Sequence, residues 1–451
     1  MYALYSLLTA AGMLLLSPYF LLRGLVRGKY LGNIPERLAW RFPPGLRAKA
    51  SPDSQEKSIW IHAVSVGEVL AVLPLAQQLK KKFPLRRLVV STTTVTGQKV
   101  AEERMPFADS VFYFPLDWSG PIRRALDAAR PGAVIIVETE IWPNFLRECR
   151  RAGVPVIFVN GRMSERSFRG YGRALLSSAG TLAGFLKKVL GDATLFLMQS
   201  KEDAARVVAL GAPRERVLVT GNMKYDLAEP GESPLSAWLE KELARSDRRP
   251  VIVAGSVLAK EEGAVLRAFA DVEREFPRAL LILAPRKPEQ FDNAASIIAE
   301  SGRKFLRRRE LTLNGAGNDT LSDSVNVILL DSVGELAGLY RLADSVFVGG
   351  SLIPGGGHNI LEPAAFGKIP IYGPSMENFR EMSEKFLAAG AAIQVKSPED
   401  LGATWSRLLR DPERAMQMGA SARELVQRNR GATERVLAEI VGVIALDRGG
   451  R

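Results

Sequence analysis

Short apolar runs alternate with amphipathic stretches over most of the chain beyond residue 55. Each run is bounded by turn or polar residues, which is typical of buried strands. In the first half the predicted strands are Ile59–Val64, Arg87–Thr92, Val111–Phe114, Ala133–Val137, Val156–Asn160 and Leu195–Gln199. The stretches between them predict helices at Gly67–Lys82, Thr96–Glu103, Ile122–Ala129 and Trp142–Arg151. Strands that alternate with helices indicate a parallel sheet covered on both faces.

The same alternation restarts in the second half, where it predicts strands at Val251–Ala254, Ala279–Ala284, Val327–Leu330, Ser345–Gly349 and Lys368–Tyr372. Residues 226–250 are rich in Pro, Gly, Ser and charge, and we interpret them as a linker. The charge cluster Lys304–Glu310 is predicted to be part of a surface loop.

These patterns predict an α/β fold with two doubly wound, Rossmann-like domains over residues 31–225 and 251–451, with a last helix that can pack back on the N-terminal domain. Ligands of open α/β sheets bind beyond the carboxyl ends of the strands. Two such sheets facing a cleft would offer two half-sites, which is the arrangement of a two-substrate enzyme of the GT-B type. The fold alone does not fix the reaction.

The first residues, Met1–Leu22, carry no charged side chain. A helix of this length, at about 1.5 Å per residue, reaches roughly 33 Å, enough to cross a hydrocarbon core of about 30 Å. Arg23, Arg27 and Lys29 follow, which by the positive-inside rule puts the bulk of the chain in the cytoplasm. We therefore predict one retained N-terminal membrane anchor over residues 1–30. A cleaved signal peptide and an interfacial helix are the alternatives, and Pro18 leaves a kinked or monotopic insertion open.

The composition narrows the partners and the chemistry. The 451-residue chain is 47% hydrophobic, so it can bury a sizeable core, and its formal net charge is +12. Such a charge suggests nucleic acid, an anionic membrane surface or an acidic substrate as partner. A single cysteine, Cys149, excludes an internal disulfide and a Cys-rich zinc site, and two histidines exclude a His-rich metal site.

The segment Phe347–Gly367 passes from an apolar run through a glycine-rich turn into a helix start. Glycines let backbone N–H groups approach a ligand, and a helix N-terminus favours an anion, so Gly355, Gly356, Gly357 and His358 predict a phosphate site. The spacing matches neither the dinucleotide fingerprint nor a P-loop. A dehydrogenase and an ATPase are therefore not indicated.

Two further strand ends in the second half can add to this site. Gly255 and Ser256 can donate to a phosphate, and Arg286 can pair with it through two nitrogens. Each is also consistent with an ordinary turn after a strand. Glu362 lies three residues after Asn359, which fits either a capping box or a carboxylate that accepts the two hydroxyls of a ribose.

Acidic residues mark two strand ends of the first half. Glu68, at the start of a predicted helix, can take a proton from a hydroxyl or form a capping box with Ser65. Glu138 and Glu140 follow a predicted strand, and they can divide acid and base roles, hold a metal, or compensate the N-terminal charge of a helix.

Basic residues follow. In the segment Asn160–Arg173, arginines alternate with aromatic residues, so it can bind phosphates, single-stranded nucleic acid or anionic lipid, or form a solvated helix face. Lys224 lies where the first half ends and can reach the predicted cleft or remain exposed.

The sequence has no Asp-x-Asp motif. A nucleoside monophosphate leaving group carries little enough charge that Arg286, a lysine and a helix N-terminus can stabilise it.

The order of these motifs resembles that of the 3-deoxy-D-manno-oct-2-ulosonic acid (Kdo) transferases of lipopolysaccharide synthesis, which move Kdo from CMP-Kdo to a lipid A precursor. The matching segments cover almost the whole chain: His62–Glu68, Ser91–Gly97, Glu138–Asn144, Asn160–Ser167, Gly221–Asp226, Ala284–Arg286 and Gly356–Pro363.

This resemblance implies an inverting, metal-independent GT-B enzyme without a cofactor, which acts on the cytoplasmic face of the inner membrane and binds its anionic surface but no nucleic acid. It implies Glu68 as the general base, Glu138 as a second essential acid and Lys224 near the reacting centre. The acceptor would be bound by Ser65, Gly67, Arg162, Arg166 and Arg169. CMP would be bound by Gly255, Ser256, Pro285, Arg286, Gly355, Gly356, Gly357, His358, Asn359 and Glu362.

Two departures from the family pattern concern the donor side. Many members carry His where this chain has Lys287, and Ser-Thr-His or Ser-Thr-Arg where it has Ser256–Ala259. They leave the detailed donor contacts open. Two other classes remain as alternatives: a sugar-nucleotide 2-epimerase on the same scaffold, which needs no anchor, and a membrane-tethered lipid-binding protein that ignores nucleotides.

Overall fold

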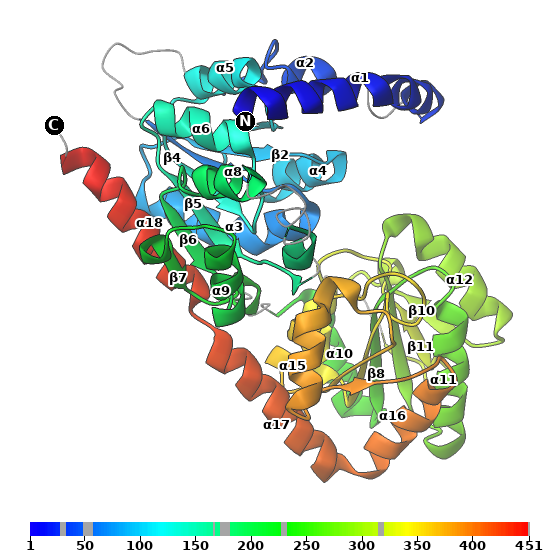
Figure 1. The fold of residues 1–451 in the computed structure, drawn as a ribbon. Helices are drawn as coiled ribbons and strands as arrows, with labels where there is room; N and C mark the ends of the chain where they lie inside the picture. Colours follow the sequence, from blue (N-terminus) through cyan, green and yellow to red (C-terminus); the bar gives the residue numbers. More distant parts are fainter. Residues whose placement is uncertain are drawn as a thin grey trace. The chain divides into compact units, whose positions relative to one another are not determined.

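The computed structural model describes residues 1–27, 33–47, 57–165, 167–171, 181–226, 232–313 and 320–449. The chain forms two compact units (Figure 1). The N-terminal unit comprises Met1–Asp226 and Arg430–Arg451, and the C-terminal unit comprises Leu227–Asn429. The segment interpreted as a linker contains a 13-residue helix, α10 (Pro234–Ser246).

The N-terminal unit is built on a seven-stranded parallel sheet of order β3-β2-β1-β4-β5-β6-β7. Its strands are β1 (Ser58–His62), β2 (Leu88–Thr92), β3 (Ser110–Tyr113), β4 (Pro131–Val137), β5 (Val156–Gly161), β6 (Leu195–Met198) and β7 (Val217–Val219). Its helices are α1 (Tyr2–Arg27), α2 (Ile34–Arg37), α3 (Val66–Lys82), α4 (Val95–Arg104), α5 (Ser119–Ala129), α6 (Pro143–Arg151), α8 (Thr181–Leu190), α9 (Lys201–Ala209) and α18 (Ala432–Gly449).

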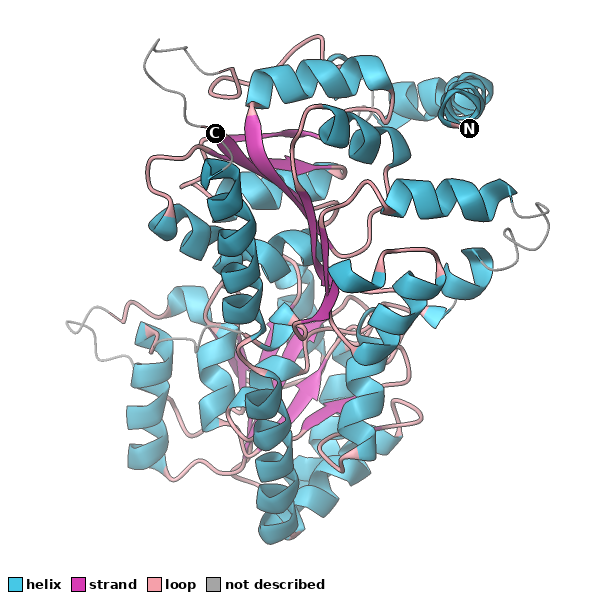
Figure 2. Ribbon diagram, turned by 60° about the vertical axis from the view of Figure 1, so that its left-hand side comes forward, coloured by secondary structure: helices cyan, strands magenta, loops and turns pink. Residues whose placement is uncertain are grey.

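Helices cover both faces of this sheet (Figure 2). Successive strand residues point to opposite faces, so Ile59 and Ile61 pack with α3 while Trp60 packs with the other core cluster. The last helix, α18, belongs to the α3 face, where Val436 and Ile440 are fully buried. The carboxyl ends of β1 and β4 lie side by side, and the strand order reverses there.

The C-terminal unit repeats the plan with the order β10-β11-β9-β8-β12-β13-β14, again parallel throughout. Its strands are β8 (Val251–Val257), β9 (Leu280–Pro285), β10 (Phe305–Arg307), β11 (Val327–Leu329), β12 (Ser345–Val348), β13 (Pro370–Tyr372) and β14 (Ile393–Gln394). Besides α10, its helices are α11 (Glu262–Glu275), α12 (Phe291–Glu300), α13 (Leu336–Leu339), α14 (Leu361–Ala365), α15 (Arg380–Ala388), α16 (Asp400–Arg410) and α17 (Pro412–Asn429). The predicted class of two doubly wound, parallel α/β units is confirmed.

The charge cluster Lys304–Glu310 is not a surface loop, which corrects the expectation from the sequence. It forms β10 and the 3-10 helix η5 (Arg308–Glu310), and β10 pairs with β11 at the edge of the sheet.

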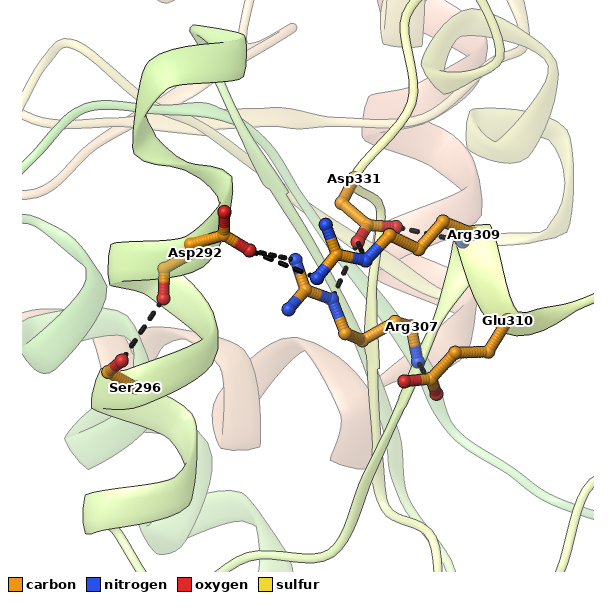
Figure 3. A network of polar contacts seen from close by, with 6 residues as sticks. All are labelled: Asp292, Ser296, Arg307, Arg309, Glu310 and Asp331. Carbon is orange, nitrogen blue, oxygen red and sulfur yellow. Dashed lines mark hydrogen bonds and ion pairs between the residues drawn. The ribbon is translucent and has the colours of Figure 1, made fainter.

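Acidic side chains from neighbouring elements hold the arginines of this cluster (Figure 3). Arg307 lies 2.7 Å from Asp331 through Nε and 2.7 Å from Asp292 through a terminal nitrogen. Arg309 contacts the same two acids at 3.4 Å and 3.1 Å. The Asp331 side chain is fully buried and that of Arg307 is 12% exposed. Buried charges are tolerated when they are paired, so these acids allow a basic stretch to form a strand.

Polar contacts hold the first turns of α1 on the N-terminal unit. The Tyr2 hydroxyl donates to Asp192 at 2.7 Å, Asn144 donates to the Ser6 hydroxyl at 3.0 Å, and Trp118 donates to the Thr9 hydroxyl at 3.1 Å. Within the described part of the chain, none of the helices combines the length and apolarity that a membrane crossing requires.

Candidate active site

Glu68 lies at the carboxyl end of β1, in the first turn of α3, and only 7% of it is exposed. Its carboxylate accepts hydrogen bonds from the Val64 N–H (2.7 Å) and from the Ser65 hydroxyl (2.8 Å). This is not the reciprocal capping box that the spacing allowed, because the Ser65 side chain accepts no bond from the helix backbone. The turn therefore fixes the carboxylate in place.

Glu138 directly follows β4 and has a φ of +59°, a left-handed conformation that costs energy for any residue with a Cβ atom. Its N–H donates to Val159 on β5 at 2.9 Å. The Lys224 ammonium, on the 3-10 helix η3 (Met223–Tyr225), lies 3.1 Å from Oε1 of Glu138, and about a quarter of each side chain is exposed. Strain of this kind gathers at functional sites, where the surrounding structure maintains it.

The acids at this edge of the sheet influence one another. Burial raises the pKa of Glu68 to about 7, and the charges of Glu138 and Glu140 add to the rise, against the two hydrogen bonds that lower it. Burial and the charge of Glu138 also raise the pKa of Glu140. The cluster therefore contains a carboxyl group that exchanges its proton near neutral pH.

Asn160, at the end of β5, supports this arrangement and was not singled out from the sequence. It is fully buried, has a φ of +53°, and its side-chain oxygen accepts the N–H of Met223 at 3.0 Å. It thereby fixes the start of η3, which carries Lys224. An asparagine at a strand end is a weak signal, since asparagine is also common in ordinary turns.

Only one end of the basic segment Asn160–Arg173 is seen to contact the loop of the acid cluster. The Arg162 N–H donates to the Thr139 hydroxyl at 2.9 Å, so this end of the segment meets the loop of Glu138 and Glu140. The Arg169 side chain is 69% exposed and pairs with Glu165, one turn earlier. Arg166 and Arg173 lie outside the described residues. Gly67 lies beside Glu68, in the first turn of α3.

In the C-terminal unit the strand order reverses between β8 and β12, which is where ligands bind in sheets of this kind. Ser256 has a φ of +56°, and a Cβ atom on Gly255 would lie 2.1 Å from the Tyr340 hydroxyl. Pro285 ends β9, and the Arg286 N–H donates to the Val257 carbonyl at 2.8 Å. The predicted strand ends after β8 and β9 therefore meet.

The glycine turn differs from the sequence-based expectation, because its amides are already paired. The N–H groups of Gly355 and Gly356 donate to the Ser375 hydroxyl at 3.1 and 2.9 Å, and that of Gly357 donates to the Gly350 carbonyl at 2.7 Å. They are not offered to a ligand. The glycines serve close packing instead, since a Cβ atom on Gly356 would lie 2.2 Å from the Asn378 amide nitrogen.

The residues after the turn offer the polar groups that the turn does not. No acceptor for the N–H groups of His358 and Asn359 is present among the described residues. The His358 Nε2 atom is buried and has no hydrogen-bond partner in the same part of the chain. Burial lowers the pKa of His358 to about 4, with a further contribution from the charge of the exposed Arg286. The ring is therefore neutral at neutral pH.

Glu362, on the five-residue helix α14, completes this group. The Asn359 side chain donates to its carboxylate at 3.2 Å and accepts the Leu361 N–H at 3.1 Å, which is a local turn rather than a capping box. Burial raises the pKa of Glu362, while Asn359 and the nearby Arg286 lower it. Arg286, His358 and Glu362 thus form one polar group in the C-terminal unit. Within the described residues, no three acidic, His or Cys side chains gather in a way that could hold a metal ion.

Comparison with known proteins identifies the family. Residues 33–227 match the family model of 3-deoxy-D-manno-octulosonic-acid (Kdo) transferases, and residues 238–425 match that of group 1 glycosyl transferases. The 3-deoxy-D-manno-octulosonic acid transferase of Haemophilus influenzae is 34% identical over 406 residues, which cover 89% of this chain and 90% of that protein. The chain belongs to the Kdo transferase family.

Other relatives agree with this assignment. The 3-deoxy-D-manno-octulosonic acid transferase of Bordetella pertussis is 33% identical over 87% of this chain and 89% of its own length. Among solved structures, the UDP-GlcNAc 2-epimerase of Neisseria meningitidis superposes with a TM-score of 0.52 over 86% of this chain and 99% of its own, at 13% identity. That likeness shows the fold alone. This Kdo transferase family member is therefore a glycosyltransferase of two Rossmann-like units.

Proposed function

We propose that this protein is an inverting transferase that moves Kdo from CMP-Kdo to a hydroxyl of a lipid A precursor, lipid IVA, and releases CMP, in lipopolysaccharide core biosynthesis. Membership of the Kdo transferase family supports Kdo as the transferred sugar. The observation that supports catalysis of the transfer is the acid cluster of the N-terminal unit, in which Glu68 has a pKa of about 7. A general base works best when its pKa lies near the working pH.

On the acceptor side, Glu68 takes the proton of the acceptor hydroxyl as its oxygen attacks the anomeric carbon of Kdo. The new carbon–oxygen bond forms while the bond to the phosphate oxygen of CMP breaks, and the anomeric configuration inverts. Glu138 is a second essential acid, and Lys224, held by it at 3.1 Å, offsets the repulsion among the acids. Arg162, Arg166 and Arg169 bind the phosphates of the lipid disaccharide, because guanidinium groups pair with phosphate through two nitrogens.

On the donor side, CMP binds to the C-terminal unit. Arg286 and the N–H groups of His358 and Asn359 bind the phosphate, and Glu362 accepts the ribose hydroxyls. A departing monophosphate develops less charge than a diphosphate, so fixed donors can stabilise it without a metal ion. The exposed Arg286, the two amides that have no acceptor in the described chain and the nearby neutral histidine support this assignment.

We place the protein at the cytoplasmic face of a bacterial inner membrane, attached through α1. Leu4, Leu7, Leu8, Leu14 and Leu15 of this helix are between 49 and 80% exposed, and their spacing gives one apolar stripe. Ser6 and Thr9 make the polar contacts with the rest of the unit. Such a stripe is suited to insert among lipid headgroups, and the net charge of +12 favours an anionic surface.

The reaction can be tested directly with the purified full chain, CMP-Kdo and lipid IVA, by weighing the lipid product. We expect a mass gain of one or more Kdo units, with equal yield in the presence of EDTA. Failure of wild-type protein to modify the lipid, with or without added Mg²⁺, would reject the proposal. Conversion of a soluble sugar nucleotide without any lipid would instead support the epimerase alternative, and lipid binding that is indifferent to nucleotide would support the non-enzymatic one.

A further inference from the structure

Glu261 is a fully buried glutamate that the proposed reaction does not use. It immediately precedes α11, and its carboxylate accepts four backbone N–H groups. Oε2 accepts those of Leu258 (2.8 Å) and Gly350 (2.7 Å), and Oε1 accepts those of Ser351 (2.9 Å) and Leu352 (2.8 Å). A buried carboxylate is tolerated when several donors compensate its charge, so these contacts explain why it can lie in the interior.

The four donors come from two different loops. Leu258 follows β8 and Ser256, whereas the other three residues follow β12 and open the glycine turn. The two loops touch backbone to backbone, since a Cβ atom on Gly349 would lie 2.6 Å from the Cα atom of Val257. One carboxylate thus joins the loops at the point where the strand order of this unit reverses.

Three consecutive amides that converge on one anion form a nest, which is a common phosphate-binding arrangement. Here the nest at Gly350–Leu352 is occupied by the protein's own carboxylate. A nucleotide phosphate is therefore excluded from it and must use groups further along the loop. Beyond the paired amides of Gly355, Gly356 and Gly357, the amides of His358 and Asn359 have no acceptor in the described chain.

The position of Gly350 determines where those groups lie. A Cβ atom on Gly350 would lie 2.6 Å from Nε2 of His358, so the His358 ring packs directly against this glycine. The Gly350 carbonyl also accepts the Gly357 N–H at 2.7 Å. Any shift of Gly350 away from Glu261 would thus move both the ring and the residue before it.

We infer that Glu261 is a positioning residue of the donor site, which holds the loop after β12 so that His358 and Asn359 meet the phosphate of the nucleotide. The inference rests on the proposed binding of CMP to this unit and deepens it. Glu261 does not touch the ligand. It acts through Gly350, and its carboxylate is required because a neutral amide would present an N–H₂ group to two of the four donors.

The neighbouring residue provides a matched control. Glu262 is also fully buried, but within the described residues its carboxylate accepts no N–H group from the loop after β12; the backbone groups that lower its pKa belong to Lys260 and to Glu262 itself, at its own end of α11. Burial raises its pKa. Glu262→Gln therefore removes a buried carboxyl group at the same end of α11 without disturbing the loop after β12.

The test compares Glu261→Gln, Glu262→Gln and Arg286→Ala in the full chain, with CMP binding measured by titration calorimetry. Loss of hydrogen bonds to a charged group predicts that Glu261→Gln weakens CMP binding about tenfold or more. It should raise KM for CMP-Kdo but not KM for the lipid acceptor, and it should speed hydrogen exchange of the amides of residues 350–352. Glu262→Gln should leave all of these within about twofold, a change well under the free-energy equivalent of one hydrogen bond.

Each outcome decides between the proposals. If Arg286→Ala loses CMP binding and a folded Glu261→Gln keeps it, the positioning role is wrong and the donor site stands. If wild-type protein does not bind CMP, or Arg286→Ala binds it normally, the proposed donor site is wrong, and the inference about Glu261 is wrong as well. Should Glu261→Gln fail to fold, Glu261→Asp keeps the charge but shortens the reach, and the same split between the two KM values is expected. An equal change in KM for CMP-Kdo and in KM for the lipid acceptor would overturn the inference.

Discussion

Lys224 and Glu138 are 86 residues apart in the chain, and yet the Lys224 ammonium lies 3.1 Å from Oε1 of Glu138. The pair forms at the carboxyl end of β4, where the backbone of Glu138 is itself strained. An ion pair that is a quarter exposed adds little stability, about 0–1 kcal/mol. Its position among three glutamates suggests that it is maintained for chemistry.

We therefore expect Lys224→Met to lower kcat strongly, by roughly 100-fold or more, while the melting temperature changes little. Steady-state kinetics and thermal unfolding measure the two effects. Lys80→Met is the matched control, because Lys80 pairs with Asp109 at 2.7 Å with similar exposure in the same unit. A loss of kcat that is equal in both variants would show that Lys224 has no special role.

Glu68 gives a prediction about pH and rate. Because its pKa is about 7, the fraction of Glu68 that can act as a base rises through neutral pH, and kcat/KM should rise with it. The negative charge of Glu138 contributes to the raised pKa, so a Glu138→Gln variant that retains measurable turnover should show its rise at lower pH. A rate profile that does not move would contradict this electrostatic coupling.

The raised pKa of Glu68 also predicts that the free energy of unfolding falls as pH rises, whereas kcat/KM rises. The pKa of Glu68 is higher in the folded state than in the unfolded chain, so the folded state binds its proton more tightly. The stabilisation is complete below the unfolded value and is lost as pH rises through about 7, by roughly 3 kcal/mol. Glu68→Gln should therefore be inactive and yet more stable than wild type at pH 8, with a smaller difference at pH 5. Urea unfolding at both pH values checks this, and a Gln variant that is less stable at pH 8 would contradict it.

The strands were predictable from the sequence because a strand buried on both faces needs a continuous apolar run, as in Ala133–Val137. The short edge strands β7, β10 and β14 were not predicted. In β10 the reason is that Arg307 is neutralised by Asp292 and Asp331, which lie elsewhere in the chain. The candidate site shows the same limit. Strand ends pointed to Glu68, Glu138 and Arg286, but nothing in the glycine turn indicates that its amides are paired with Ser375.

A glycine can be required because its φ is positive or because there is no space for a Cβ atom. A comparison of Gly357 with Gly302 distinguishes these two reasons. Both have a φ of +74°, but a Cβ atom on Gly357 would lie 2.4 Å from the Met376 sulfur, whereas nothing lies within 4 Å of one on Gly302. Gly302→Ala should cost about 1 kcal/mol from the backbone alone. Gly357→Ala should cost more and should also weaken CMP binding. Equal losses of stability with unchanged CMP affinity would show that the turn does not need its close packing.

Glu362 makes the donor proposal specific to a ribose. If its carboxylate accepts both ribose hydroxyls, wild-type protein should bind CMP more tightly than 2′-deoxy-CMP, by about tenfold for one hydrogen bond to a charged group. Glu362→Gln should reduce that preference, and calorimetry with the two nucleotides measures it. Arg286→Lys serves as a comparison, since it should weaken both nucleotides equally by removing the bidentate contact. An unchanged preference in Glu362→Gln would place the ribose elsewhere.

The exposed leucines of α1 lead to a prediction about membrane attachment. Replacing Leu7, Leu8, Leu14 and Leu15 by Ser removes most of the apolar stripe while leaving the contacts of Tyr2, Ser6 and Thr9 in place. Burial of a leucine side chain is worth about 1.5–3 kcal/mol, so the four changes together should abolish binding to vesicles that contain anionic lipid. Vesicle flotation measures binding, and CMP titration shows whether the C-terminal unit is intact.

Leu85, which is 78% exposed between α3 and β2, is the control position, and its replacement by Ser should leave flotation unchanged. If the α1 variant floats as wild type does, attachment depends on the basic residues instead, and high salt should then release it.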